Sequence, residues 1–181
     1  MRPLLAILIL LSLWPAYAQS DSGARDLYEA IRNGNLPRVQ ALLSRSPGLA
    51  RVSVEGKTPL HEVARVSPKN SVEMARALLD AGADVNVRDD IMLWTPLFSA
   101  CNSGNEPLVR LLLARGADVK VKTAFAETPL HVAQTVEVVK LLIKAGADIN
   151  AVDEHGETPA ASARQYRQPV YRYLKSSGGK E

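Results

Sequence analysis

One short phrase, Thr-Pro-Leu-His or a near relative of it, occurs four times along this chain. At intervals of 37, 33 and 30 residues, the copies begin at Thr58, Thr95, Thr128 and Thr158. A second phrase, Gly-Ala-Asp, follows each of the first three copies and ends at Asp84, Asp118 and Asp148. Two phrases in a fixed order at a period of roughly 33 residues indicate an array of helical repeats. Because such a repeat buries its apolar side only against its neighbours, this period restricts the chain to a stacked, elongated fold.

Each repeat is predicted to contain two helices. Threonine before proline is typical of a helix start, because the hydroxyl accepts a hydrogen bond from an unpaired backbone N–H and proline fits the first turn. A leucine stripe such as Leu108, Leu111 and Leu112 predicts the second helix. Gly116 then ends that helix, since glycine adopts the left-handed conformation at little cost. The stretch before the next Thr-Pro is expected to form a hairpin-like finger.

These phrases resemble the ankyrin repeat, most clearly at residues 128–133 and 140–150. The resemblance runs from about Ala24 to Lys175 and implies an all-α fold. We expect an ankyrin-repeat solenoid of about five stacked helix pairs, including two capping repeats. The expected segments are an N-terminal capping repeat at 24–50, repeats at 51–86, 87–119 and 120–150 (shortened), a C-terminal capping repeat at 151–175 and a flexible tail at 176–181.

Two repeats depart from the expected length. The first carries extra residues at 67–70, so its inter-helix turn is predicted to bulge. The shortened repeat lacks residues around Gln134 and Thr135, so its inter-helix turn is predicted to be clipped. In a stack held by nearest-neighbour contacts, we expect the shortened repeat to be a weak link.

The finger tips differ from one another. The first and last are polar and contain glycine, whereas residues 91–94 (Ile-Met-Leu-Trp) and 124–127 (Ala-Phe-Ala-Glu) contain none. The resemblance implies that finger tips often contact partners, and an exposed apolar patch is typical of an interaction site. The alternative is that Leu93 or Trp94 folds back over the first helices. The candidate partner-binding residues are Ile91, Met92, Leu93, Trp94, Phe125, Glu127, His155 and Glu157.

Other chemistry-bearing residues favour structural roles. The resemblance implies that His61 and His131 form hydrogen bonds within and between turns. His155 has only loop carboxylates beside it, which do not define a metal site. Cys101 lies among small helix residues and is expected to be buried and inert. With no catalytic constellation in the sequence, we expect no enzyme activity, no cofactor and no metal.

The start of the chain predicts export. Arg2 precedes an apolar run over residues 4–13, and small residues surround Ala18. This layout indicates a signal peptide at 1–18, cleaved after Ala18, and the apolar run is too short to span a membrane. Small exported animal domains usually contain disulfides, and Cys101 is the single cysteine of this chain. We therefore expect the bacterial periplasm.

These observations predict a non-enzymatic, monomeric protein-binding module with one protein partner and without stable membrane insertion. The formal net charge of +3 gives no case for nucleic acid as the partner. The resemblance to exported bacterial ankyrin-repeat proteins implies a helper of a stress enzyme such as catalase, or an immunity protein that neutralises a secreted toxin. A third reading is an envelope-associated structural role, in which the basic, aromatic end after Ala160 contacts anionic lipid.

Overall fold

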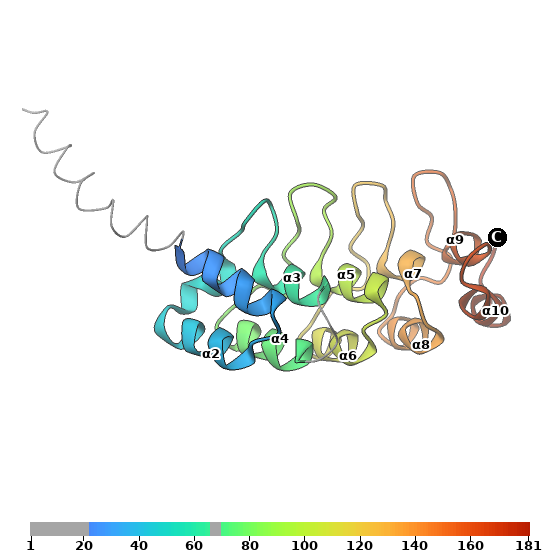
Figure 1. Ribbon diagram of the computed structural model, residues 1–181. Helices are drawn as coiled ribbons and strands as arrows, with labels where there is room; N and C mark the ends of the chain where they lie inside the picture. The colour runs from blue at the N-terminus through green and yellow to red at the C-terminus, as the bar shows by residue number, and fades with distance from the viewer. Residues whose placement is uncertain (1–21, 66–69) are drawn as a thin grey trace, which may run out of the picture.

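The structure is a computed structural model that describes residues 22–65 and 70–181. The predicted signal peptide and most of the insertion at 67–70 lie outside the described residues. Within the described ranges, five helix pairs stack in a row (Figure 1). This arrangement confirms the predicted all-α repeat solenoid.

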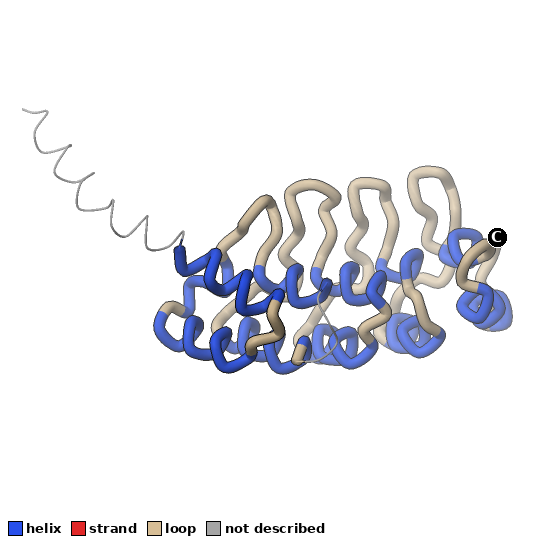
Figure 2. Tube along the Cα trace, in the orientation of Figure 1, coloured by secondary structure: helices blue, strands red, loops and turns tan. Residues whose placement is uncertain are grey.

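The helix pairs form two layers, and four loops project from the layer of first helices (Figure 2). The described part of the chain contains no β-strand, only an isolated bridge between Val54 and Lys57. The first helices are residues 22–32, α3 (Pro59–Arg65), α5 (Pro96–Ser103), α7 (Pro129–Val132) and α9 (Pro159–Ala163). The second helices are α2 (Leu36–Arg45), with the 3-10 turn η1 (Pro47–Arg51) after it, α4 (Ser71–Asp80), α6 (Glu106–Ala114), α8 (Val136–Lys144) and α10 (Gln168–Ser176).

The repeated threonines begin the first helices, as the sequence predicts. The Thr95 hydroxyl oxygen accepts a hydrogen bond from the Phe98 N–H at 3.2 Å, and Thr158 accepts one from Ala161 at 3.3 Å. Thr128 forms a reciprocal capping box with the His131 side chain. All three threonines are buried. Their hydroxyls therefore satisfy helix-end N–H groups that water does not reach.

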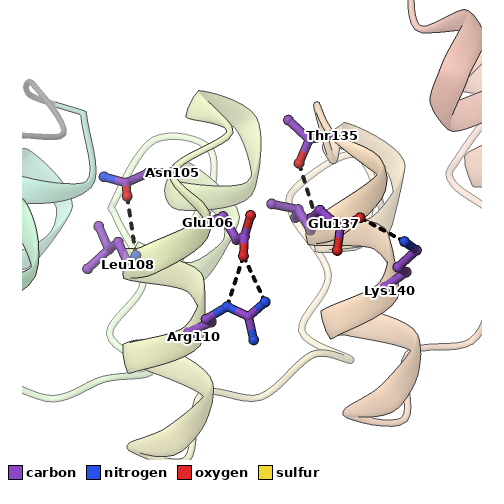
Figure 3. Close-up of polar contacts among 8 residues, drawn as sticks. Asn105, Glu106, Leu108, Arg110, Thr135, Glu137 and Lys140 are labelled. Atoms are coloured by element: carbon purple, nitrogen blue, oxygen red, sulfur yellow. Dashed lines mark hydrogen bonds and ion pairs between the residues drawn. The ribbon is translucent and has the colours of Figure 1, made fainter.

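The second helices have caps of their own, which the sequence reasoning missed. The Asn105 side-chain oxygen accepts from the Leu108 N–H and Thr135 accepts from Val138, each at 3.2 Å (Figure 3). An Asn or Thr immediately before the leucine stripe was the available signal.

The outer surface of α6 and α8 is charged and solvated. Glu106 pairs with Arg110, and Glu137 pairs with Lys140, each at 2.7 Å (Figure 3). Both pairs lie within one helix and are largely exposed, so each contributes little to stability.

A single apolar core runs through the whole stack. Leu60, Leu97 and Leu130, one from each repeated phrase, are fully buried. Ala100 and Cys101 are also fully buried in the same core, and their small size lets adjacent first helices approach closely. Stability therefore comes mainly from repeat-to-repeat contact.

The shortened repeat loses part of a helix as well as part of a turn. α7 has 4 residues, whereas α5 has 8. Two contacts from neighbouring repeats compensate: the Gln134 N–H donates to the Cys101 carbonyl at 3.3 Å, and the Arg167 guanidinium donates to the Ala133 carbonyl at 2.9 Å. Burial lowers the pKa of Arg167, as expected for a cation that fills a gap in the stack.

Residues 176–181, predicted to form a flexible tail, instead complete the last repeat. The Lys180 N–H donates to the Asn150 side-chain oxygen at 2.8 Å. Two repeats earlier, the Asp118 N–H donates to the Asn86 side-chain oxygen at the same distance. The segment was misassigned because its sequence lacks the Gly-Ala-Asp phrase, although it takes the same backbone path.

Candidate functional site: the finger tips

Four finger tips lie side by side along one edge of the stack (Figure 2). We call them the tip row. From the first finger to the fourth, the tips are residues 54–57, 89–94, 123–127 and 153–157.

Backbone hydrogen bonds join each tip to the preceding one. The Asp90 N–H donates to the Gly56 carbonyl at 3.1 Å. The Ala124 N–H donates to the Met92 carbonyl at 3.0 Å. Glu154 donates in the same way to Phe125 at 3.0 Å. The tip row is therefore one connected surface rather than four independent loops.

Each tip contains a residue with left-handed backbone two positions before the threonine. In the first and last fingers this residue is Gly56 or Gly156, with φ of 75° and 78°. In the second and third fingers it is Leu93 or Ala126, with φ of 56° and 60°. A side chain in this region costs roughly 1–2 kcal/mol. The two central fingers therefore store backbone strain at this position, a feature that clusters at functional sites. In the first tip, Glu55 is also left-handed, with φ of 52°.

A buried carboxylate organises the second tip. Asp89 is 3% exposed. One of its carboxylate oxygens accepts from the N–H groups of Ile91 at 3.2 Å, Met92 at 2.8 Å and Trp94 at 3.4 Å. Sequence reasoning missed this residue, although Asp153 occupies the corresponding position in the fourth finger and predicts the same role. Asp89 holds the extra residue of this finger in a fixed turn.

Four of the five apolar candidate residues are exposed. The exposed fractions are 64% for Ile91, 38% for Met92, 37% for Leu93 and 43% for Phe125. The second and third tips are hydrogen bonded to each other, so these side chains lie on adjacent tips, and we call the four of them the apolar tip patch.

Trp94 is only half-buried and does not extend outward with the others. Its ring packs on Phe98, with the ring centroids 4.7 Å apart and the planes at 42°. The alternative that the sequence left open, folding back over the first helix, therefore holds for Trp94 and not for Leu93. The reason lies in the repeated phrase, where Phe98 stands at the place that His61 and His131 take in the first and third copies.

The two histidines of the repeated phrase link neighbouring repeats. The Nε2 atom of His61 lies 2.9 Å from the Trp94 carbonyl oxygen, and that of His131 lies 3.1 Å from the Glu157 carbonyl oxygen. The Nδ1 atom of each faces the threonine three residues earlier. Burial lowers the pKa of both imidazoles, which fits neutral, structural side chains. This confirms the predicted structural role.

The polar candidates flank the apolar tip patch. Glu127 is half-buried and accepts a hydrogen bond from the Thr123 hydroxyl at 3.4 Å. His155 and Glu157 are exposed on the fourth tip. The His155 imidazole lies 3.6 Å from the Glu154 carboxylate.

A small recess opens beside Trp94, between the second finger and the first helices. It encloses about 140 Å³ and is lined by Trp94, Lys57, Arg65 and Asn102 among others. Sites for whole small molecules enclose about 300–1,000 Å³. The recess therefore suits a single side chain of a partner better than a metabolite.

The described residues offer little else for chemistry. They contain no group of three or more metal-binding side chains, and none of their helices is long and apolar enough to cross a membrane. The Cys101 thiol is buried, and burial raises its pKa, which suppresses the reactive thiolate.

Comparison with known proteins agrees with the repeat pattern. Residues 8–89, 27–123 and 97–180 each match a family model described as ankyrin repeats in three copies. Protein PhlB of Serratia liquefaciens is 38% identical over 98 residues, covering 54% of this chain and 42% of PhlB. Human protein phosphatase 1 regulatory subunit 27 is 35% identical over 89 residues, covering 49% of this chain and 55% of that protein. The putative E3 ubiquitin-protein ligase XBAT35 of Arabidopsis thaliana is 33% identical over 117 residues, 64% of this chain but 25% of the ligase. The chain thus spans less than two thirds of each relative.

Proposed function

Because the chain belongs to the ankyrin repeat family, whose members are generally non-enzymatic protein-binding modules, we propose that it captures one protein partner through its tip row and the adjacent face of the first helices. The observation that carries this proposal is the apolar tip patch: Ile91, Met92, Leu93 and Phe125 are all more than a third exposed. Contiguous exposed apolar side chains on a soluble domain are typical of interaction sites.

The backbone supports the same interpretation. Leu93 and Ala126 occupy positions that the first and last fingers fill with glycine. The carboxylate of Asp89 and the hydrogen bonds between tips hold the backbone of the tips in place before any partner binds. A surface ordered in advance loses less entropy on binding than a mobile loop does.

The test is capture of a partner by the mature chain. Wild-type protein, immobilised and exposed to periplasmic extract, is expected to retain one protein, which is then identified, purified and titrated. Replacing Ile91 and Phe125 by serine should weaken the measured affinity at least tenfold, because exposed apolar anchors carry much of the energy at such interfaces. Serine keeps the backbone unchanged, and circular dichroism checks the fold.

Tyr166 provides the matched control. It is 83% exposed but lies between α9 and α10, away from the tip row. Tyr166→Ser removes a comparable exposed ring and is expected to leave the affinity unchanged. Equal losses from the tip and control variants would exclude the tip row as the binding surface.

The proposal includes the compartment and the class of partner. The signal-like segment 1–18 and the single cysteine support export to a bacterial periplasm. N-terminal sequencing of the chain recovered from the periplasm of an expressing cell should begin at Gln19. A helper of a stress enzyme such as catalase is the first candidate role, and neutralisation of a secreted toxin is the second. Titration against a catalase and a toxin encoded beside the gene separates these two roles.

The envelope role has less support. Arg164 and Lys175 each lie 3.5 Å from the Glu181 carboxylate, and Arg167 donates to the Ala133 carbonyl. These internal partners reduce the positive charge that this end can offer to anionic lipid. Sedimentation with anionic liposomes at low and moderate salt tests the role, because lipid binding of this kind weakens with ionic strength.

A further inference from the structure

We propose that the tip row recognises an apolar protein segment flanked by lysine or arginine, with the cationic residues contacting the fourth finger. This inference rests on the proposed function and adds the chemistry of the partner. It combines two observations, the apolar patch on the second and third tips and the charge of the tip beside them.

The apolar and acidic tips are in direct contact. The Glu154 N–H donates to the Phe125 carbonyl at 3.0 Å, and the Ala124 N–H donates to the Met92 carbonyl at 3.0 Å. A single bound segment can therefore cover the exposed rings and chains of the middle tips and reach the fourth tip. No rearrangement of the fingers is needed.

The fourth tip offers carboxylates that no lysine or arginine of the described residues pairs with. Residues 151–157 contain three acidic residues and neither lysine nor arginine. Glu154 and Glu157 are exposed, and neither forms an ion pair with a lysine or arginine of the described residues. The Asp153 carboxylate is already used within the loop, since it accepts hydrogen bonds from the backbone N–H groups of His155 and Glu157. Glu154 and Glu157 thus remain available to a partner.

The neighbouring finger does not neutralise this charge. The Lys122 ammonium group donates to the Val152 carbonyl at 3.0 Å, so it binds backbone at the base of the fourth finger rather than a tip carboxylate. A complementary partner brings its own cations. Phosphate-rich partners such as nucleic acid or anionic lipid are disfavoured here, because like charges repel.

An array of random peptides tests the inference before the natural partner is identified. Fluorescently labelled mature protein is applied to the array, and bound signal is compared with the apolar content and net charge of each peptide. The highest signal is expected on peptides that combine a large apolar residue with two or more lysines or arginines. The best binders are then synthesised and titrated in solution.

Two pairs of substitutions separate the contributions. The variant with Glu154→Gln and Glu157→Gln should bind the basic apolar peptides about fivefold to tenfold more weakly than the wild type, and this difference should shrink at high salt. The variant with Ile91→Ser and Phe125→Ser should have a lower affinity for every peptide that the wild type binds. The matched charge control is Glu73→Gln with Glu137→Gln on the outer helices, where both side chains are exposed. It should leave binding unchanged.

Each result is decisive. Binders that depend on Ile91 and Phe125 but show no enrichment in lysine or arginine, or no response to the Glu154 and Glu157 substitutions, would overturn this inference and leave the proposed function intact. Binders insensitive to Ile91 and Phe125, or an array with no binders, would count against the proposed function itself. An equal loss from the outer-helix control would also overturn the inference, because a general charge effect then explains it.

Discussion

Replacing Ala126 by glycine is predicted to stabilise the protein. The φ of Ala126 is 60°, a left-handed value that costs a residue with a side chain roughly 1–2 kcal/mol. Glycine removes this strain, but its unfolded chain has more conformational freedom, worth roughly 0.5–1 kcal/mol. The balance is a gain of roughly 0.5–1 kcal/mol in the free energy of unfolding.

Leu93 provides an internal replicate, because its φ is 56°. Leu93→Ala removes most of the side chain and keeps the strain, whereas Leu93→Gly removes both. The glycine variant should therefore be more stable than the alanine variant by the same roughly 0.5–1 kcal/mol. Urea denaturation followed by circular dichroism measures each free energy of unfolding. An unchanged dependence of this free energy on urea concentration indicates that each variant exposes the same surface area on unfolding.

The control is the same substitution in a helix. Ala41 is exposed in the middle of α2, where alanine is the best residue, so Ala41→Gly should destabilise by roughly 1 kcal/mol. Opposite signs at Ala126 and Ala41 are the signature of strain at the tip. If Ala126→Gly destabilises as much as Ala41→Gly does, the tips store no strain and the reasoning fails.

Three further predictions concern the folded state as a whole. Burial lowers the pKa of His61 and His131 below their ordinary value of 6.5. As the pH falls, these histidines therefore become protonated in the unfolded chain before they do in the folded protein. The free energy of unfolding from urea titration should therefore fall from pH 7 to pH 5, by at most roughly 1.4 kcal/mol per pH unit for each histidine, and a variant with both changed to glutamine should lose this slope. Deleting residues 177–181 should destabilise by roughly 1–3 kcal/mol, since the hydrogen bonds of that segment are lost, and urea titration again measures it. The Cys101 thiol should react with Ellman's reagent only after unfolding, and rapid reaction in the folded protein would contradict its burial.

The parts of the fold that follow from local chemistry were predictable from the sequence. Thr95 and Thr158 cap helices because a threonine before proline has this role wherever a helix starts. Gly82 and Gly116 end helices with φ of 91° and 86°, as a residue without a side chain permits. These features depend on a few neighbouring residues, so the sequence alone reveals them.

The parts that depend on distant contacts were not predictable. The sequence left two orientations open for Trp94, and only the structure, in which its ring packs on Phe98, decides between them. The segment after Ser176 docks because Asn150 lies one repeat earlier in the stack. Most of the candidate site was predicted from the amino-acid composition of the tips. The role of Asp89 in shaping the second tip became apparent only from the structure.

The four-residue α7 has a consequence for how the whole molecule comes apart. In a linear stack, cooperative unfolding depends on the interface between each pair of neighbouring repeats, so the repeat with the smallest interface limits the cooperativity of the whole array. Heat or mechanical tension would therefore unfold the repeat that contains α7 before it unfolds the repeats on either side. The apolar second tip and the acidic fourth tip would then belong to separate folded parts, and neither part alone would carry the whole of the proposed binding surface.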